Sequence, residues 1–266
     1  MISHRVSYDI TKQDLKQGEG LSTPIFFGLF LLYQLLLTFQ GLDLLDEGFH
    51  VSFYQQIFRD PSSVQYCFLY WFTGIAGGTW LKAFPFLGLW GLRLAGVLTI
   101  TATAWTAHRM LQPFVRRPVL QAALALIVIF MNTEPRDLNY NAFSAWLYFS
   151  TASLLFFGMT KKRPMLILAA GALVGLNMLA RLPNLLGLGM GLILFWHAHE
   201  TEHSWKRAWK QFSLFLAGFL AAVAISLLFM KAIGHLDLYW RSLRSLFVMS
   251  ADARNGDGVD QAYSLG

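Results

Sequence analysis

The feature that most constrains the fold of this chain is a succession of seven apolar segments, separated by short polar stretches. A helix needs about 20 mostly apolar residues to cross the hydrocarbon core of a bilayer. The pattern therefore predicts an all-α protein, a polytopic transmembrane helical bundle of about seven spans. The segments cover residues 24–41, 87–111, 118–133, 140–159, 164–181, 183–198 and 211–234.

Composition favours the same class of protein. Of the 266 residues, 55% are hydrophobic and 14% are charged, whereas about a quarter of the residues in a soluble domain are charged. The net charge of +6 comes from short basic clusters between the apolar segments, so we expect membrane lipids as partners and no nucleic acid. The one cysteine, Cys67, excludes an intramolecular disulfide and a CxxC motif.

The distribution of charge predicts which polar stretches lie in the cytoplasm. With the N-terminus inside, the cytoplasmic segments carry twelve of the 21 Lys and Arg residues but only five of the 15 acidic residues. Cytoplasmic loops are enriched in Lys and Arg, so this orientation is favoured. The twelve basic residues are Arg5, Lys12, Lys16, Arg109, Arg116, Arg117, Lys161, Lys162, Arg163, Lys206, Arg207 and Lys210.

An eighth apolar stretch, residues 66–82, is interrupted by Gly74, Gly77 and Gly78. If it were a span, either the Arg109–Arg117 cluster or the N-terminus would fall on the wrong side of the membrane. We therefore expect it to lie outside, in the membrane interface.

The chain has no internal repeats, low-complexity tracts or Gly/Ser linkers, which predicts one domain over residues 1–266. Its expected parts include a cytoplasmic tail (1–23), a first extracytoplasmic loop (42–86) and an extracytoplasmic tail or loop (235–266). The polar, Gly- and Asp-rich composition of the last residues is typical of a loop. The absence of a closing element is consistent with the N-terminal portion of a longer protein.

Ionisable residues gather just after the first apolar segment, in the stretch LDLLDEGFH. Asp46 and Glu47 could act as catalytic carboxylates, because such groups at a membrane boundary are costly unless they have a function. The alternative is that Asp46 caps a helix and Glu47 favours its dipole. The following segment, 48–59, has a helical pattern and could lie on the membrane surface or pack on the spans as a linker.

A second acidic loop, NTEPRDLNYN, carries Glu134 and Asp137 on either side of Arg136. Together with the first acidic stretch it could form facing carboxylate loops or a divalent-metal site of oxygen ligands. The alternative is a solvated loop in which Arg136 pairs with one of its acidic neighbours. No ligand spacing is diagnostic, and a lone histidine such as His50 is more often a hydrogen-bonding residue than a ligand. We therefore assign no metal ligands, although a divalent metal remains an option.

Two arginines are candidates for binding a lipid phosphate at the outer face. Arg181, in the tight turn ARLPN, can hold a phosphate with two parallel hydrogen bonds, and Arg93 is a lesser candidate. The alternative for Arg181 is that its side chain extends to the lipid headgroups. Gly171 and Gly175 form a GxxxG pair, which at most indicates close packing of helices.

The DE pair after the first span, the phrase LWGLRLAGVLTI and the turn ARLPN resemble the GT-C superfamily of membrane glycosyltransferases. The likeness is closest to the bacterial relatives of dolichyl-phosphate-mannose protein mannosyltransferases and of aminoarabinose transferases, and it covers Leu21 to Met230. One departure is that Asp60-Pro61-Ser62 replaces the His-Pro usual in that family.

The resemblance implies transfer of a sugar from a polyprenyl-phosphate carrier to a protein, lipid or glycan acceptor, outside the bacterial cytoplasmic membrane. It implies that Asp46 is the first-loop catalytic acid, with Glu47 beside it. The second-loop acid would be Glu134 or Asp137, and arginines would bind the carrier phosphate. His50, in the same corner, is a further substrate-binding candidate, and no cofactor is assigned.

Two other functions are alternatives for a chain of this kind. A lipid or solute transporter would carry ionisable residues at mid-membrane or Gly/Pro-broken helices in paired halves, and neither pattern stands out here. A polysaccharide polymerase or ligase of the outer leaflet would depend on arginines more than on a DE pair.

Overall fold

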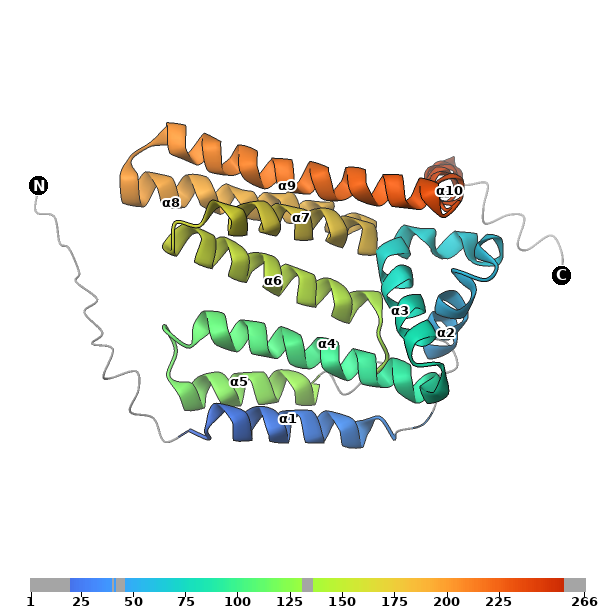
Figure 1. The fold of residues 1–266 in the computed structure, drawn as a ribbon, viewed down its shortest axis with the longest axis horizontal. Coiled ribbons are helices and arrows are strands. Elements are labelled where there is room, and N and C mark those ends of the chain that lie inside the picture. Colours follow the sequence, from blue (N-terminus) through green and yellow to red (C-terminus); the bar gives the residue numbers. More distant parts are fainter. Residues whose placement is uncertain (1–19, 40, 42–45, 131–135, 256–266) are drawn as a thin grey trace, which may run out of the picture.

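The computed structural model describes residues 20–39, 41, 46–130 and 136–255, and every regular element within them is helical (Figure 1). The all-α prediction is confirmed for this part of the chain. The first half consists of α1 (Thr23–Leu37), α2 (Asp46–Gln56), the 3-10 helix η1 (Pro61–Tyr70), α3 (Trp71–Ala83), the short η2 (Pro85–Leu87), α4 (Gly88–Leu111) and α5 (Arg117–Phe130). The second half consists of α6 (Tyr140–Thr160), α7 (Pro164–Ala180), η4 (Leu182–Leu192), α8 (Ile193–Glu202), α9 (Trp205–Ala232) and α10 (Leu236–Asn255).

Each of the seven apolar segments forms a helix of one bundle. Among the described residues, three helices are long and apolar enough to cross a membrane, namely Pro85–Leu111, Tyr140–Thr160 and Trp205–Ala232. Three shorter apolar helices are Thr23–Leu37, Arg117–Phe130 and Pro164–Ala180. The remaining segment, 183–198, is η4 followed directly by α8.

The bundle has two distinct ends (Figure 1). The α4–α5, α6–α7 and α8–α9 connections lie at one end, which we call the basic end because it carries Arg116, Arg117, Lys161, Lys162, Arg163, Lys206 and Arg207. The other end is covered by α2, η1 and α3, together called the cap (residues 46–83). The polar stretches expected on the two sides of a membrane therefore separate to the two ends of the bundle.

Glycines allow α7 and α9 to pack backbone against backbone. A Cβ atom on Gly171 would lie 1.8 Å from the carbonyl oxygen of Phe215, and one on Gly218 would lie 2.0 Å from that of Leu168. Gly175 faces the Phe219 carbonyl in the same way, at 2.8 Å. The close packing indicated by the GxxxG pair is thus confirmed.

Glycines also explain the apolar stretch 66–82, which forms the end of η1 and most of α3. Cβ atoms on Gly74, Gly77 and Gly78 would overlap side chains of α2 and of the two residues that follow it, which pack directly on these glycines. Phe53 and Ile57 are therefore buried against α3. The packing of α2 matches the interpretation of segment 48–59 as a linker helix, because these side chains face protein rather than lipid.

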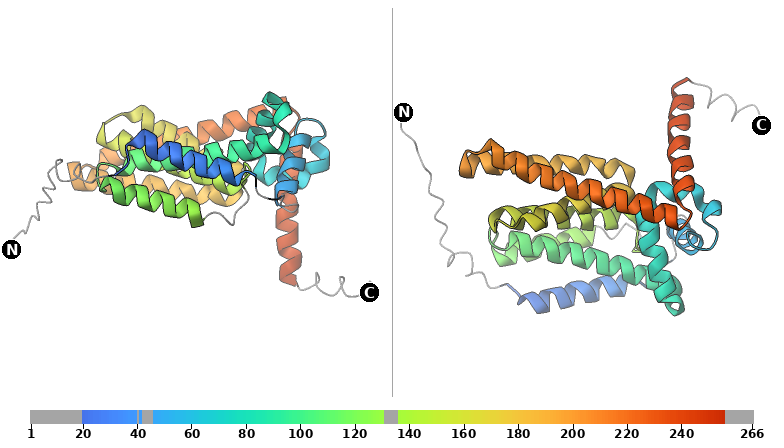
Figure 2. Two further views of the ribbon diagram at one scale, coloured as in Figure 1. Left: turned by 90° about the horizontal axis from the view of Figure 1, so that it is seen from below. Right: turned by 45° about the horizontal axis from the view of Figure 1, so that its top comes forward.

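The expected tail or loop over residues 235–266 contains a helix in its described part. Residues 236–255 form α10, which projects away from the axis of the bundle beside the cap (Figure 2). His235, between α9 and α10, is buried, and its Nδ1 accepts a hydrogen bond of 3.2 Å from Trp71 Nε1. This bond ties the end of α9 to the cap.

Candidate functional site

A buried ion pair fixes the first turn of α2 on α4. Arg93 Nε and Nη2 donate hydrogen bonds of 2.8 Å to the two carboxylate oxygens of Glu47. The same guanidinium donates to the carbonyl oxygens of Thr38, at 2.6 Å, and Gly41, at 2.9 Å. Glu47 is 1% exposed and Arg93 is 8% exposed. These two candidates bind each other in this structure, so the arrangement favours a role in holding the site in shape.

A second buried contact joins the two acidic regions. His50 Nδ1 on α2 lies 2.6 Å from Asp137 Oδ2, and both side chains are buried. Tyr54, one turn further along α2, donates its hydroxyl to the carbonyl oxygen of Leu138. Of the two acidic candidates in the second loop, Asp137 therefore meets α2, whereas Glu134 lies outside the described residues.

The second acidic loop can lie this close because α4 presents a glycine to it. A Cβ atom on Gly96 would lie 2.2 Å from the carbonyl oxygen of Arg136 and 2.5 Å from that of Asp137. The backbone N–H of Leu138 donates to the Leu92 carbonyl at 3.1 Å. The loop is thus seated on the backbone of α4, which fixes the position of the Asp137 carboxylate.

Asp46 is the exposed carboxylate of this corner. It begins α2, and its side chain is exposed, unlike that of the adjacent Glu47. Because an α-helix rises 1.5 Å per residue, Asp46 lies about 6 Å along the axis from His50, on the same face. An exposed carboxylate next to a buried, hydrogen-bonded corner can accept a proton from a ligand that binds there.

Arg181 reaches the same corner through Tyr140. Arg181 follows the last residue of α7, and its guanidinium carbon lies 5.4 Å from the centroid of the Tyr140 ring. The His50 ring lies 5.7 Å from the same Tyr140 ring, and Tyr70 of the cap stacks on it at 4.4 Å. Arg181 Nη1 also donates to Asn141 Oδ1 at 2.9 Å. One tyrosine thus connects the acidic corner to the predicted phosphate-binding arginine.

The sequence alone did not single out Tyr140, Tyr70 and Asn141. The run Asn139–Asn141 did contain a signal, because Asn139 is the N-cap of α6 and its Oδ1 accepts from the N–H of Ala142 at 2.8 Å. Recognising that cap places Tyr140 and Asn141 in the first turn of the helix, facing the corner. Nothing in the sequence pairs Tyr70 with Tyr140.

Asparagines also hold the α7–η4 turn that carries Arg181. Asn184 Nδ2 donates to Ser144 Oγ at 2.7 Å and to Asn177 Oδ1 at 2.9 Å. Tyr148 donates its hydroxyl to the Asn184 carbonyl at 3.2 Å. The turn ARLPN is therefore anchored to α6, and Arg181 is held at a defined position.

Burial shifts several pKa values around this corner. It lowers the pKa of the Arg136 guanidinium and raises the pKa of the Tyr54 hydroxyl well above its usual value. Burial raises the pKa of the Cys67 thiol to about 12, which makes it unreactive at neutral pH. Cys67 is thus a buried packing residue.

The described residues do not include a cluster suited to a metal ion. No group of three or more His, Cys, Asp or Glu side chains within them is arranged to hold one. The residues that meet at the corner are a histidine–carboxylate pair and a guanidinium–carboxylate pair, in which each carboxylate already has a cationic or imidazole partner. No step of the chemistry below is therefore assigned to a metal.

An apolar cavity adjoins the corner, next to Leu138. It has a volume of about 300 Å³ and lies between α3, α4 and α6. Its walls are formed by Ala76, Trp80, Ala95, Leu98, Thr99, Ala102, Leu138, Phe143 and Trp146. Two tryptophans and aliphatic side chains make this cavity suitable for a hydrocarbon chain.

Comparisons with protein-family models, with curated proteins and with solved structures find no match to this chain.

Proposed function

We propose that this protein is an integral membrane glycosyltransferase that moves a sugar from a polyprenyl-phosphate carrier to an acceptor hydroxyl. The observation that carries the proposal is the Tyr140 ring, which contacts His50 of the acidic corner and the guanidinium of Arg181. A carboxylate and a phosphate-binding arginine near one another are what such a transfer needs. The likeness to GT-C enzymes in the DE pair and the ARLPN turn supports the same reaction.

In the proposed reaction, Asp46 accepts the proton of the acceptor hydroxyl as its oxygen attacks the anomeric carbon. The bond between that carbon and the phosphate oxygen breaks, and polyprenyl phosphate leaves with the bonding electron pair. Negative charge near the ring stabilises the oxocarbenium-like transition state. Arg181 binds the phosphate with charge-assisted hydrogen bonds, which become stronger as charge builds on the leaving group.

The buried pairs position these groups. Glu47 and Arg93 hold the first turn of α2, which carries Asp46, on α4. The His50–Asp137 contact fixes the next turn against the second loop. Both pairs are almost completely buried, so they act on the reaction by keeping Asp46 in place.

The apolar and charged surfaces support a lipid carrier and a membrane orientation for the proposed enzyme. The cavity of about 300 Å³ beside Leu138 would accept the first isoprene units of the carrier. The protein would be a multi-pass protein of the bacterial cytoplasmic membrane, with its N-terminus and basic end in the cytoplasm and the cap outside. The acceptor would then bind from the extracytoplasmic side.

Sugar transfer in proteoliposomes tests the proposal. The full-length protein would be supplied with radiolabelled polyprenyl-phosphate-mannose and polyprenyl-phosphate-aminoarabinose, and release of free carrier would be followed together with sugar transfer. Asp46→Asn removes the base but keeps the size of the side chain. We expect its turnover to fall about 100-fold or more, because general base catalysis contributes about 10²–10⁴-fold.

Asp60→Asn is the matched control, because Asp60 is an exposed aspartate of the same cap whose carboxylate accepts from Ser62 at 2.6 Å. We expect it to retain wild-type turnover. Equal turnover of the Asp46→Asn variant and the wild type would remove Asp46 as the base. The absence of transfer by wild-type protein in which the carrier is bound would refute the enzymatic proposal.

A further inference from the structure

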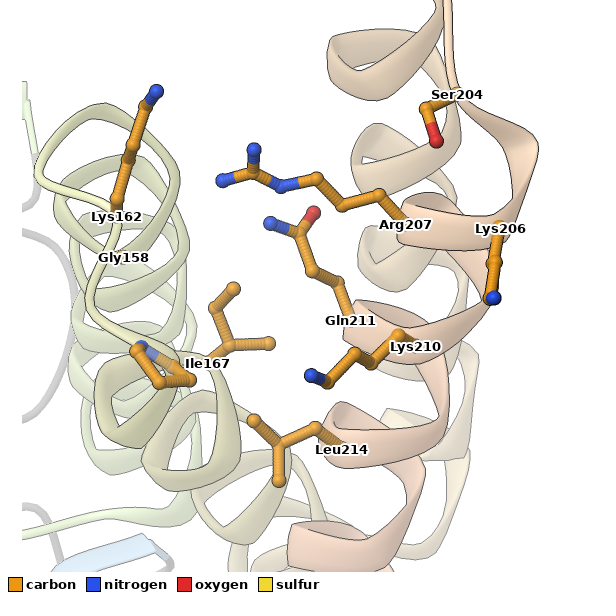
Figure 3. Close-up of a pocket in the computed structure, with 10 residues that line it drawn as sticks. Gly158, Lys162, Ile167, Ser204, Lys206, Arg207, Lys210, Gln211 and Leu214 are labelled. Carbon is orange, nitrogen blue, oxygen red and sulfur yellow. The ribbon is translucent and has the colours of Figure 1, made fainter. Parts of the chain in front are cut away.

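A second cavity lies at the basic end of the bundle, between the α6–α7 turn and the first turns of α9 (Figure 3). Its volume is about 460 Å³. It is far along the bundle from the cap, so the proposed reaction does not use it. The lining residues are Gly158, Lys162, Pro164, Ile167, Ser204, Lys206, Arg207, Lys210, Gln211 and Leu214.

Positive charge is concentrated around this cavity. Four of the ten lining residues are basic and none of the ten is acidic. Figure 3 shows Arg207, Lys210 and Gln211 reaching from α9 toward α7. Basic side chains gathered around a cavity without an acidic lining residue give it a positive potential, which favours an anionic ligand.

Two helix N-termini add to this positive potential. α7 begins at Pro164 and α9 begins at Trp205, both at the cavity. Their N-cap residues, Arg163 and Ser204, make no capping hydrogen bond through their side chains, and neither first turn contains an acidic residue. The N-terminus of a helix carries about +0.5 of a charge, and its free N–H groups can bind phosphate.

Lys162 occupies a position where a glycine would be expected. It follows the end of α6 with φ of 52°, and the N–H of Arg163 donates to the Gly158 carbonyl at 2.9 Å. Helices that end in this way usually place glycine at the residue with positive φ. A lysine there brings an ammonium group to the rim of the cavity.

The rest of the cavity and its surroundings are apolar and aromatic. Ile167 is buried, and Leu214 continues the wall along α9. Trp196, Trp205 and Trp209 are exposed on α8 and α9 close by. Exposed tryptophans on a membrane protein gather at the level of the lipid headgroups.

We propose that this cavity is a binding site for a phosphate anion at the membrane surface. The same chemistry could be presented by the headgroup of an anionic phospholipid or by a free phosphate compound. The apolar wall and the tryptophans match a phospholipid, whose acyl chain would follow Ile167 and Leu214. The site does not depend on the proposed enzymatic function.

Lipid retention measured by native mass spectrometry tests this site. The full-length, delipidated protein in neutral detergent would be titrated with phosphatidylglycerol and, in parallel, with phosphatidylcholine. The Arg207→Gln/Lys210→Gln variant removes two of the lining charges. We expect its affinity for phosphatidylglycerol to fall about 30-fold at about 0.1 M salt, since each basic residue near an anionic headgroup contributes roughly a factor of five.

The control variant is Lys231→Gln/Arg241→Gln, which removes the same two charge types from exposed positions near the other end of α9 and on α10. It should bind like the wild type. A third arm adds millimolar inorganic phosphate: no displacement of phosphatidylglycerol identifies the lipid headgroup as the ligand, and displacement at similar affinity identifies a free phosphate compound. Equal binding by both variants, or equal binding of phosphatidylcholine and phosphatidylglycerol, would overturn the proposal.

Discussion

Removing the charge of Glu47 is the perturbation whose cost the structure defines best. In Glu47→Gln the guanidinium of Arg93, only 8% exposed, loses the carboxylate that accepts from its Nε and Nη2 at 2.8 Å. Breaking a buried ion pair by removing one partner costs about 3–5 kcal/mol. The Thr38 and Gly41 carbonyls still accept from Arg93, so we expect the lower end of that range, about 3 kcal/mol.

The assay is reversible unfolding in mixed detergent micelles, followed by tryptophan fluorescence. Glu200→Gln is the matched control, because Glu200 is exposed on α8, and its substitution should change the free energy of unfolding by less than about 0.5 kcal/mol. Combining Glu47→Gln with Arg93→Met completes a double-mutant cycle. The cycle should give a coupling energy of about 2 kcal/mol.

Two results would refute this reasoning. One is a cost for Glu47→Gln equal to that of Glu200→Gln, and the other is a coupling energy near zero. Either would mean that the carboxylate and the guanidinium do not stabilise each other. The Glu47–Arg93 pair could then not hold α2 on α4.

Three further predictions concern packing, pH and donor binding. Gly171→Ala should destabilise the protein by about 2 kcal/mol, since its Cβ would lie 1.8 Å from a backbone oxygen, whereas Gly28→Ala, whose Cβ meets no atom within 4 Å, should not. Burial lowers the pKa of His235, so the unfolded chain binds this proton more readily. Stability should therefore fall as the pH drops below about 6.5, a slope measurable by thermal melts and reduced in His235→Gln. Arg181→Lys should raise the KM for the polyprenyl-phosphate donor about tenfold without changing the melting temperature.

The helices of the bundle were largely predictable from the sequence. Each of the seven apolar segments forms a helical part of the bundle, because a long apolar run flanked by polar turns leaves few alternatives to a helix. The close approach of α7 and α9 was also indicated, by Gly171 and Gly175. The predicted segment 164–181 begins at Pro164, which is also the first residue of α7.

Two parts of the fold were harder to predict from the sequence. α10 is amphipathic and has no long apolar run, so the sequence resembled a tail although residues 236–255 are helical. The packing of α2 on Gly74, Gly77 and Gly78 depends on contacts between two elements, and the same apolar face of α2 would also suit a membrane surface. Periodicity identifies an apolar face without identifying what covers it.

The sequence identified the candidate site residues, but it did not show which residues they pair with. The pairs Glu47–Arg93 and His50–Asp137 join residues 46 and 87 positions apart in the chain. Only the tertiary fold reveals that Glu47 is buried whereas its neighbour Asp46 is exposed. Because Asp46 and Glu47 are adjacent carboxylates, the sequence alone gives no reason to assign them different roles.

The central claim is that the carrier phosphate binds at the corner formed by the cap, α6 and the turn after α7. Photo-labelling tests it most directly, with a polyprenyl-phosphate-sugar that carries a diazirine on its first isoprene unit, irradiated in vesicles containing the full-length protein. We expect labelled peptides around Trp80, Leu138 and Trp146, with labelling competed by unmodified donor and reduced in Arg181→Gln. Labelling confined to the basic end, or labelling of the corner that unmodified donor does not compete, would contradict the account.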